Sequence, residues 1–334
     1  MNALACIAFL CASCTGMAHI EIAKRGVEPA YSIVVRRNAT ENERNAAKEF
    51  ANGVRQLTGA NLATVVGKAP SKGVYLNAAG VPEELGEDGF TLKVKDGDVF
   101  VTGGRRGVIY GVHELLETYG GILWLAPDFT HVPTNGVFSV PVDLNVCQKP
   151  ALGSRNLTAF DSWALTEFAT KLRLNETTID EKLGGSARSF DDVLSRCHTF
   201  QKLVPPSKYF NAHPEYFSLV NGNRTKDHAQ LCLTNPDVFD IALSNVLARI
   251  AANKSHSDPK RRSIRYYGVS QDDWNGYCRC DRCAAIDARE ESHAGCVIWF
   301  VNKIAEAVEK VHPDVMISTL AYMYSRKPPK FLKP

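Results

Sequence analysis

The sequence predicts a two-domain protein, in which a small α+β domain precedes an α/β domain built from parallel β/α units. The chain has 334 residues, more than the ~100–200 of an average domain. Residues 31–145 contain a β-hairpin between two helix patterns, whereas strand and helix patterns alternate after Pro150, as in parallel β/α units. Pro141 and Pro150 interrupt these patterns, so we place the boundary near Val140–Pro150.

The N-terminal domain, residues 25–145, begins with a strand at Tyr31–Val35 and a helix behind a capping box. In that box, Thr40 and Glu43 each satisfy a free amide of the first turn. Apolar residues then recur at helical spacing up to Gly59, which predicts the end of the helix. They are Ala46, Ala47, Phe50, Val54 and Leu57.

A second strand and a hairpin follow in the same domain. The strand is Val74–Leu76, and the hairpin joins Phe90–Lys95 to Val99–Val101 through Asp96-Gly97, a pair suited to the positive φ angles of a tight turn. Beyond a break at Gly103-Gly104, a helix is predicted with a buried stripe at Val108, Val112, Leu115 and Leu116.

Strands and helices alternate in the C-terminal domain, residues 150–334. The strands are predicted at Arg155–Phe160, Ile264–Val269 and Val315–Leu320. The helices are predicted at Trp163–Leu174, after the cap Asn235 with Pro236 at the first helical position, and at Cys296–Val311.

The net charge of the chain and its first 18 residues indicate which partners and which cellular compartment the protein has. Lys plus Arg number 39 and Asp plus Glu 36, a net charge of +3 that is too even for a nucleic-acid binder. Residues 1–18 carry no charge, and Gly16-Met17-Ala18 is a small-x-small cleavage site, so we predict a signal peptide and a secreted or periplasmic protein. The alternative is a buried first strand. No apolar run reaches the ~20 residues of a membrane span.

Two parts of the chain resemble known families. Gly103–Leu116, a Gly-rich turn leading into a helix, resembles the end of the N-terminal domain of family 20 hexosaminidases and family 67 α-glucuronidases. Five later motifs resemble, in the same order, a bacterial barrel family catalogued as a domain of unknown function and found in exported polysaccharide-degrading proteins. They are Cys197-His-Thr-Phe, His213-Pro-Glu-Tyr-Phe, Leu231-Cys-Leu-Thr-Asn-Pro236, Ser270–Cys283 and Leu320-Ala-Tyr. This resemblance implies a TIM-like barrel and a carbohydrate substrate.

The length of the C-terminal part does not suffice for a whole barrel. A (β/α)₈ barrel needs roughly 250 residues, and the strand at Val315–Leu320 is only about the fifth that such a barrel would have. We therefore expect a partial, C-terminally truncated TIM-like barrel, that is, a fragment. The alternative is a shorter, self-sufficient α/β domain.

Asp272 and Asp273 are the candidate catalytic residues, because they follow the strand predicted at Ile264–Val269. Barrel enzymes act at the carboxyl ends of their strands, and glycosidic cleavage uses one carboxyl group as acid and a second group to assist. The pair resembles those of family 20 and family 84 enzymes, whose substrate supplies its 2-acetamido group as nucleophile. This resemblance implies that Asp272 orients the acetamido group and Asp273 is the general acid. The alternative is an Asx turn.

Five residues are candidates for binding the sugar. Aromatic rings pack on sugar faces, and an Arg can bind hydroxyls or a uronate carboxylate. The candidates are Trp274, Tyr322, Tyr324, Arg155 and His198. For each residue the alternative is a structural role. The aromatic residues would pack in the core, Arg155 would form an ion pair, and His198 would be a structural histidine whose ring nitrogens are hydrogen-bonded within the protein.

Three cysteines lie close together in the sequence and are candidate metal ligands: Cys278, Cys280 and Cys283. Three thiols this close can converge on Zn²⁺, which takes four N or S ligands, with Cys296, Cys232 or a nearby His as the fourth. Disulfides in an exported protein, or free thiols packing the loop, are the alternatives. Each would fix the loop that carries the two acids.

The sequence therefore predicts an exported glycoside hydrolase, or a truncated remnant of one, acting on an oligo- or polysaccharide. Substrate-assisted cleavage of an N-acetylhexosaminide is the first choice of mechanism. The alternatives are α-glucuronidase-like activity on uronic-acid glycans and a non-catalytic carbohydrate-binding protein. Neither mechanism requires a cofactor, so the only metal expected is a structural zinc.

Overall fold

The computed structural model describes residues 18–157, 165–176 and 178–334. All but the last residue of the predicted signal peptide, and the end of the strand predicted at Arg155–Phe160, lie outside these residues. The chain forms two compact units, Met1–Ser186 and Ala187–Pro334, called unit 1 and unit 2 below. The division thus falls about forty residues after the expected boundary at Val140–Pro150.

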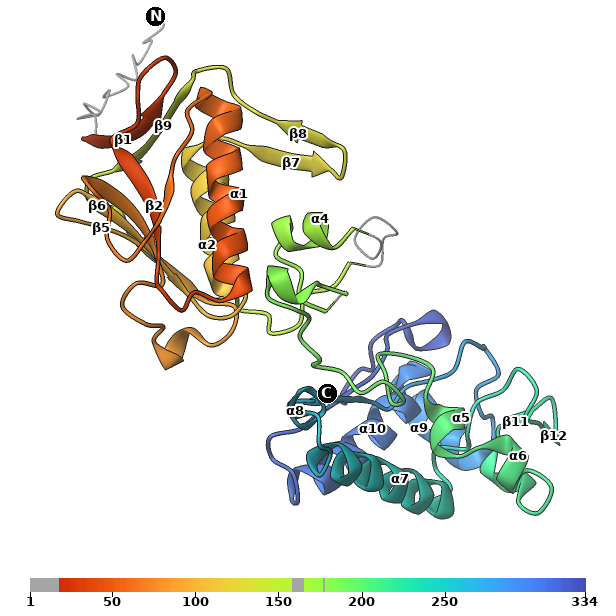
Figure 1. The fold of residues 1–334 in the computed structure, drawn as a ribbon. Coiled ribbons are helices and arrows are strands. Elements are labelled where there is room, and N and C mark those ends of the chain that lie inside the picture. The colour runs from red at the N-terminus through yellow and green to blue at the C-terminus, as the bar shows by residue number, and fades with distance from the viewer. Residues whose placement is uncertain (1–17, 158–164, 177) are drawn as a thin grey trace, which may run out of the picture. The chain divides into compact units, whose positions relative to one another are not determined.

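A six-stranded mixed sheet forms the centre of unit 1, in the order β10-β5-β6-β4-β2-β3 (Figure 1). Its strands are β2 (Tyr31–Val35), β3 (Thr64–Val66), β4 (Lys72–Leu76), β5 (Phe90–Lys95), β6 (Asp98–Gly103) and β10 (Asn145–Gln148). The predicted hairpin is confirmed as β5–β6, and its turn residues Asp96 and Gly97 both have positive φ, 53° and 82°. The strands β2, β3, β4 and β6 pair in parallel.

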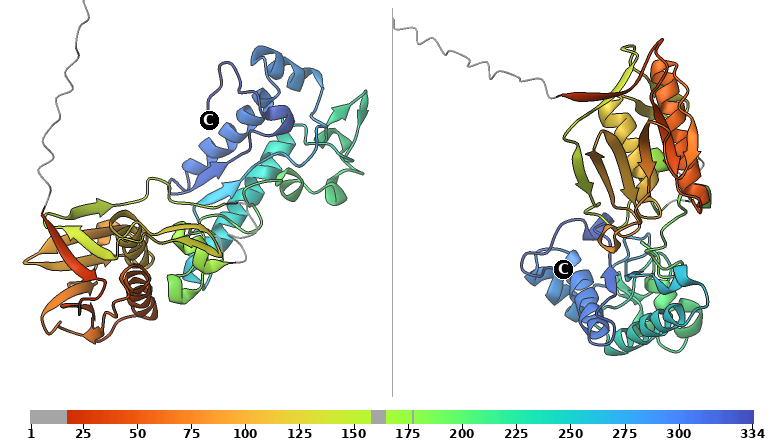
Figure 2. Two further views of the ribbon diagram at one scale, coloured as in Figure 1. Left: turned by 90° about the horizontal axis from the view of Figure 1, so that it is seen from above. Right: turned by 60° about the vertical axis from the view of Figure 1, so that its left-hand side comes forward.

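Two helices lie side by side against this sheet and bury its core (Figures 1 and 2). Helix α1 (Glu41–Thr58) begins at the predicted capping box, in which the Glu43 amide donates to Thr40 Oγ1 at 3.2 Å and the Thr40 amide to Glu43 Oε2 at 2.8 Å. It ends at Gly59 as predicted, and this glycine is left-handed, with a φ of 79°. Helix α2 (Gly107–Glu114) continues into a π-helical turn, η2 (Leu115–Tyr119), and carries the predicted buried stripe.

Smaller elements complete unit 1. Strand β1 (His19–Lys24) pairs with β9 (Val137–Pro141), and β7 (Leu123–Ala126) pairs with β8 (Phe129–His131). Helix α4 (Thr166–Lys171) lies within the helix expected at Trp163–Leu174 and ends three residues before Leu174; Trp163 lies outside the described residues. Two 3₁₀ turns are η1 (Glu83–Leu85) and η3 (Glu181–Leu183).

Unit 2 is mainly helical, with a small parallel sheet. Its long helices are α7 (Pro236–Lys254), capped by Asn235 as predicted, and α10 (Ala294–Glu309). Shorter helices are α5 (Phe200–Leu203), α6 (Pro206–Tyr209), α8 (Pro259–Arg262) and α9 (Asp281–Arg289), with 3₁₀ turns η4 (Pro214–Tyr216) and η5 (Met323–Ser325). Strand β13 (Tyr266–Gly268) pairs in parallel with β14 (Met316–Ser318), and β11 (Leu219–Val220) forms a hairpin with β12 (Asn223–Arg224).

The structure does not confirm a partial TIM-like barrel. Unit 2 is mixed α/β, and its described residues close no barrel: β13 and β14, three residues each, are its only parallel strand pair, extended by an isolated parallel bridge between Phe190 and Tyr266. One β/α crossover, β13 to β14 through α9 and α10, is present. No helix among the described residues is both long and apolar enough to span a membrane.

Candidate functional site

The loop after β13 and the loop after β14 leave the same edge of the sheet, because the two strands are parallel. The first loop is held from several sides. The amides of Thr199 and Phe200 donate to the Ser270 carbonyl at 3.1 and 3.0 Å. The Gln271 side chain donates to the Tyr322 carbonyl at 2.9 Å and so joins the two loops.

Gln230 fixes the backbone around Asp272. Its side-chain oxygen accepts from the Asp272 amide at 2.9 Å, and its side-chain nitrogen donates to the carbonyls of Asp272 at 2.9 Å and Trp274 at 2.7 Å. An amide side chain carries an acceptor oxygen and a donor nitrogen side by side, as this arrangement requires. Gln230 therefore determines the path of the loop that carries both candidate acids.

The Asp272 carboxylate is buried, and 7% of the residue is exposed. Burial raises its pKa to about 6, against the opposing effects of the Gln201 amide, which donates to Oδ2 at 3.1 Å, and the positive charges of His198 and Lys202. A carboxyl group of this pKa exchanges its proton near neutral pH, which suits an acid–base role.

Asp273 is exposed, so the neighbouring acids have different surroundings. Its carboxylate accepts a hydrogen bond from the Tyr322 hydroxyl and raises the pKa of that tyrosine. Tyr322 itself is 42% exposed. The structure thus brings Asp272, Asp273 and Tyr322 to one edge of the sheet, but the two carboxylates do not share one environment.

His198 and Trp274 lie beside these residues. His198 has a positive φ of 57°, its Nδ1 is 3.2 Å from the Gln271 carbonyl oxygen, and its ring centre is 6.2 Å from that of Tyr322. Trp274 is 39% exposed, and its ring centre is 4.4 Å from that of His228. His198 therefore lies against the loop that carries the two acids, and Trp274 is part of that loop.

Tyr324 faces a different region from Tyr322. It lines a hollow of about 610 Å³ together with Tyr277 and His293, whose rings stack at 4.0 Å. Burial, with the negative charges of Asp287 and Asp272, raises the pKa of Tyr324. Its ring is 5.2 Å from that of Tyr277.

Arg155 belongs to unit 1, not to unit 2 where the acids lie. Its guanidinium is 3.4 Å from Asp88 and donates to the carbonyls of Arg173 and Leu152, both at 2.8 Å. These contacts are those of an ion-paired structural residue.

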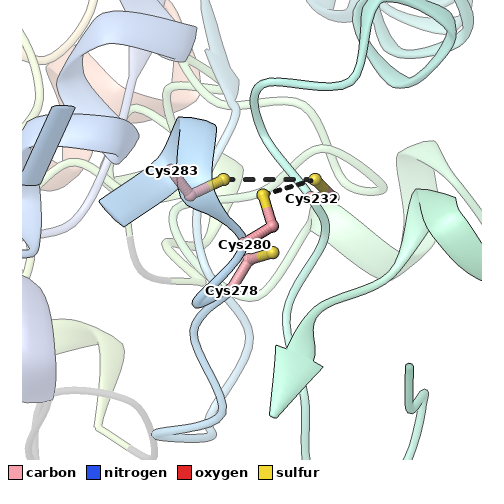
Figure 3. Close-up of side chains that lie close together, drawn as sticks. All are labelled: Cys232, Cys278, Cys280 and Cys283. Atoms are coloured by element: carbon pink, nitrogen blue, oxygen red, sulfur yellow. Dashed lines mark hydrogen bonds between the residues drawn. The ribbon is translucent and has the colours of Figure 1, made fainter. Parts of the chain in front are cut away.

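Four cysteine side chains converge in unit 2, from two segments of the chain (Figure 3). Cys278, Cys280 and Cys283 come from the start of α9 and the loop before it, and Cys232 comes from the segment before α7. Their sulfur atoms all lie within 4.8 Å of one another. Contact with Cys232 raises the pKa of Cys278 and Cys283, because a thiolate at Cys232 disfavours a second negative charge beside it. The four cysteines thus form a candidate metal site.

Two site residues, Gln201 and Gln230, escape a reading of the sequence alone. The sequence assigns them no role, and their contacts with Asp272 span 71 and 42 residues. Cys232 is one of the candidate fourth ligands, and its sulfur position distinguishes it from Cys296, which donates to the Cys283 carbonyl at 3.2 Å.

Residues 124–334 match the family model described as "Domain of unknown function (DUF4838)". The chain belongs to the DUF4838 family. This confirms the expected membership of a family of unknown function. The DUF4838 match includes both candidate acids and all four clustered cysteines. Among curated proteins, none matches the chain.

Similar solved structures are glycoside hydrolases. The chain resembles BtGH115A, a family GH115 4-O-methyl-α-glucuronidase with specificity for decorated arabinogalactans, with 14% identity and a TM-score of 0.44 over 91% of this chain and 43% of that one. It resembles Streptomyces plicatus N-acetyl-β-hexosaminidase with 15% identity and a TM-score of 0.40, over 94% and 64% of the two chains. It resembles Flavobacterium johnsoniae chitobiase with 13% identity and a TM-score of 0.42, over 91% of this chain and 51% of that one. The chain spans less than two thirds of each of these proteins.

Proposed function

We propose that this chain is a carbohydrate-active protein, a glycoside hydrolase whose acid–base group lies in the loop after β13. The observation that carries the proposal is the Asp272 carboxyl, which is buried at the carboxyl edge of a parallel strand pair and has its pKa raised to about 6. A carboxyl group that keeps its proton up to about pH 6 can protonate a glycosidic oxygen as the bond breaks.

The acids take different roles in this proposal. Asp272, with the raised pKa, protonates the leaving oxygen. The exposed Asp273 accepts a hydrogen bond from the substrate's acetamido N–H, and the acetamido oxygen attacks the anomeric carbon. Water then opens the cyclic intermediate while Asp272, now a carboxylate, takes up a proton. This exchanges the roles that the family 20 resemblance implies, because burial singles out Asp272 as the group that retains a proton.

Aromatic rings around the acids support a sugar ligand. Tyr322 contacts Asp273, and the next residue after Asp273 is Trp274, whose ring is exposed. Rings in such positions can pack against the C–H faces of a pyranose while the carboxylates bind its polar groups. We propose the same kind of contact for Tyr324 in its own hollow. The chemistry uses only carboxyl groups and the substrate's amide, so it needs no cofactor.

The test is hydrolysis of aryl glycosides by the full chain. We expect release of the aryl group from an aryl N-acetylglucosaminide, and a loss of about 100-fold or more in kcat for Asp272→Asn. Asp273→Asn should reduce kcat as well. Asp240→Asn, which changes an exposed carboxylate on α7, is the matched control and should leave the rate unchanged.

Two results would contradict the proposal in different ways. Release from an aryl uronide alone would replace the substrate-assisted mechanism by an α-glucuronidase-like one. Absence of hydrolysis with every aryl glycoside, together with retention of an N-acetylglucosamine oligomer on a sugar column, would make the chain a carbohydrate-binding protein.

A further inference from the structure

We propose that Cys232, Cys278, Cys280 and Cys283 bind one Zn²⁺ ion, and that this ion ties the segment 229–233 to the loop 270–283. The inference is independent of the proposed hydrolase activity, because it concerns only the metal and the path of the chain. It rests on the sulfur geometry, on the donors around the sulfurs and on the hydrogen bonds that join the two segments.

Two of the sulfur–sulfur separations are close to those of a tetrahedral site, and all four sulfurs are near enough to share one ion. Four sulfurs at ~2.3 Å from a central Zn²⁺ would lie about 3.8 Å from one another. Cys232 Sγ is 3.7 Å from Cys280 Sγ and 4.0 Å from Cys283 Sγ, and all four lie within 4.8 Å (Figure 3). A disulfide would join two sulfurs at about 2.0 Å and separate that pair from the others. Four sulfurs facing one centre therefore favour a metal over two bridges.

The surroundings supply donors to the thiolates. The Leu219 amide donates to Cys278 Sγ at 3.3 Å, and the Arg224 guanidinium is 3.6 Å from the same sulfur. Such outer partners orient metal ligands and tune their basicity. A Zn²⁺ with four thiolates carries a net charge of −2, which the Arg224 cation offsets in part. Four protein ligands leave no open position, so the site is structural, not catalytic.

The same two segments meet again beside Asp272. The Gln230 amide donates to the Gly276 carbonyl at 2.9 Å, and its side chain holds the backbone of Asp272 and Trp274. Cys232 lies two residues after Gln230, and Cys278 lies two residues after Gly276. An ion that joins the cysteines therefore also holds Gln230 against the loop of Asp272.

Metal analysis of the full chain tests the binding. We expect about one Zn²⁺ per chain after purification without chelators, and loss of the metal in Cys232→Ser. Cys296→Ser is the matched control, because Cys296 is buried beside the cluster but its thiol donates to a carbonyl; it should keep the metal. Exchange into Co²⁺ should give the intense visible absorption of a tetrahedral thiolate site.

A second variant and a second readout guard against misfolding. Cys280→His should retain metal, since histidine is also a zinc ligand and Cys280 is only partly buried. Removing the metal should accelerate hydrogen exchange in residues 229–233 and 270–276 but not in α1 of unit 1. A metal-free chain, a mass lowered by two hydrogens per disulfide, or zinc retained in Cys232→Ser would overturn the site. If removing the metal leaves the hydrogen exchange of these residues unchanged, the ion does not link segment 229–233 to loop 270–283.

Discussion

At the scale of single residues, Asp272 and Asp273 show how strongly a loop can separate two identical side chains. Asp272 faces the Gln201 amide inside unit 2, whereas Asp273 reaches the exposed Tyr322 hydroxyl. Their position after a strand could be predicted from the sequence, because an apolar strand and a polar turn are both local patterns. Which acid is buried could not, since Gln201 and Gln230 lie far away in the chain.

The raised pKa of Asp272 predicts a pH-dependent gain in stability for Asp272→Asn. A carboxyl group whose pKa rises on folding stabilises the fold below the unfolded pKa, near 4, and that contribution is lost as the pH rises through about 6. Asparagine stays neutral and its oxygen can still accept from Gln201. We therefore expect similar free energies of unfolding at pH 4, and a gain of up to about 3 kcal/mol for the variant at pH 8, at ~1.4 kcal/mol per pKa unit.

Urea unfolding of both proteins at the two pH values measures this difference. Asp240→Asn, on the exposed face of α7, should change the free energy of unfolding by less than ~0.5 kcal/mol at either pH. A variant less stable than the native chain at pH 8 would show that the Asp272 charge is compensated in the folded state.

At the scale of elements, features that depend on neighbouring residues could be predicted from the sequence, whereas pairing between distant strands could not. The capping box of α1, the Asp96-Gly97 turn and the Asn235 cap were all predictable, because each depends on a few neighbouring residues. The β1–β9 pair joins residues over a hundred positions apart and was missed. The strands β13 and β14 were predicted longer than their three residues, because an apolar pattern does not reveal where pairing stops.

Gly107, the first residue of α2, shows why the Gly-rich segment that leads into this helix needs its glycines. A Cβ on Gly107 would lie 2.0 Å from the Gly89 carbonyl oxygen, which belongs to the backbone and cannot move aside alone. We expect Gly107→Ala to lower the free energy of unfolding by about 1–3 kcal/mol, the usual range for overpacking. Chemical denaturation measures it, with the exposed Lys48→Ala on α1 as the control. An equally small effect of both substitutions would mean that the turn can relax.

At the scale of the whole molecule, the described residues form two separate hydrophobic cores, and a partial barrel is not confirmed in the second part. One core is formed by residues between Ile22 and Leu183, and the other by residues between Leu194 and Val315. Alternation of strands and helices correctly indicated β/α pairing in the second part, as β13 and β14 show. It could not indicate how many strands pair, because that number depends on contacts between distant segments.

Because the two units have separate cores, we expect a destabilising substitution in one unit to leave the stability of the other unchanged. Gly107→Ala should accelerate hydrogen exchange of the amides in α1 and β4, because it weakens the core of unit 1. Exchange in α7 and α10 should keep its native rate, since these helices belong to the core of unit 2. Mass spectrometry of exchanged peptides separates the two units. Equal acceleration in both would show that they unfold as one.

The thiols are divided unequally between these cores. Among the described cysteines, Cys147 alone belongs to unit 1, where it is exposed on β10. The others belong to unit 2, and four of them converge at one point. We therefore expect peroxide to affect the two units differently. In unit 1 it would oxidise one exposed side chain, whereas in unit 2 oxidation of the clustered thiols would abolish the proposed Zn²⁺ site.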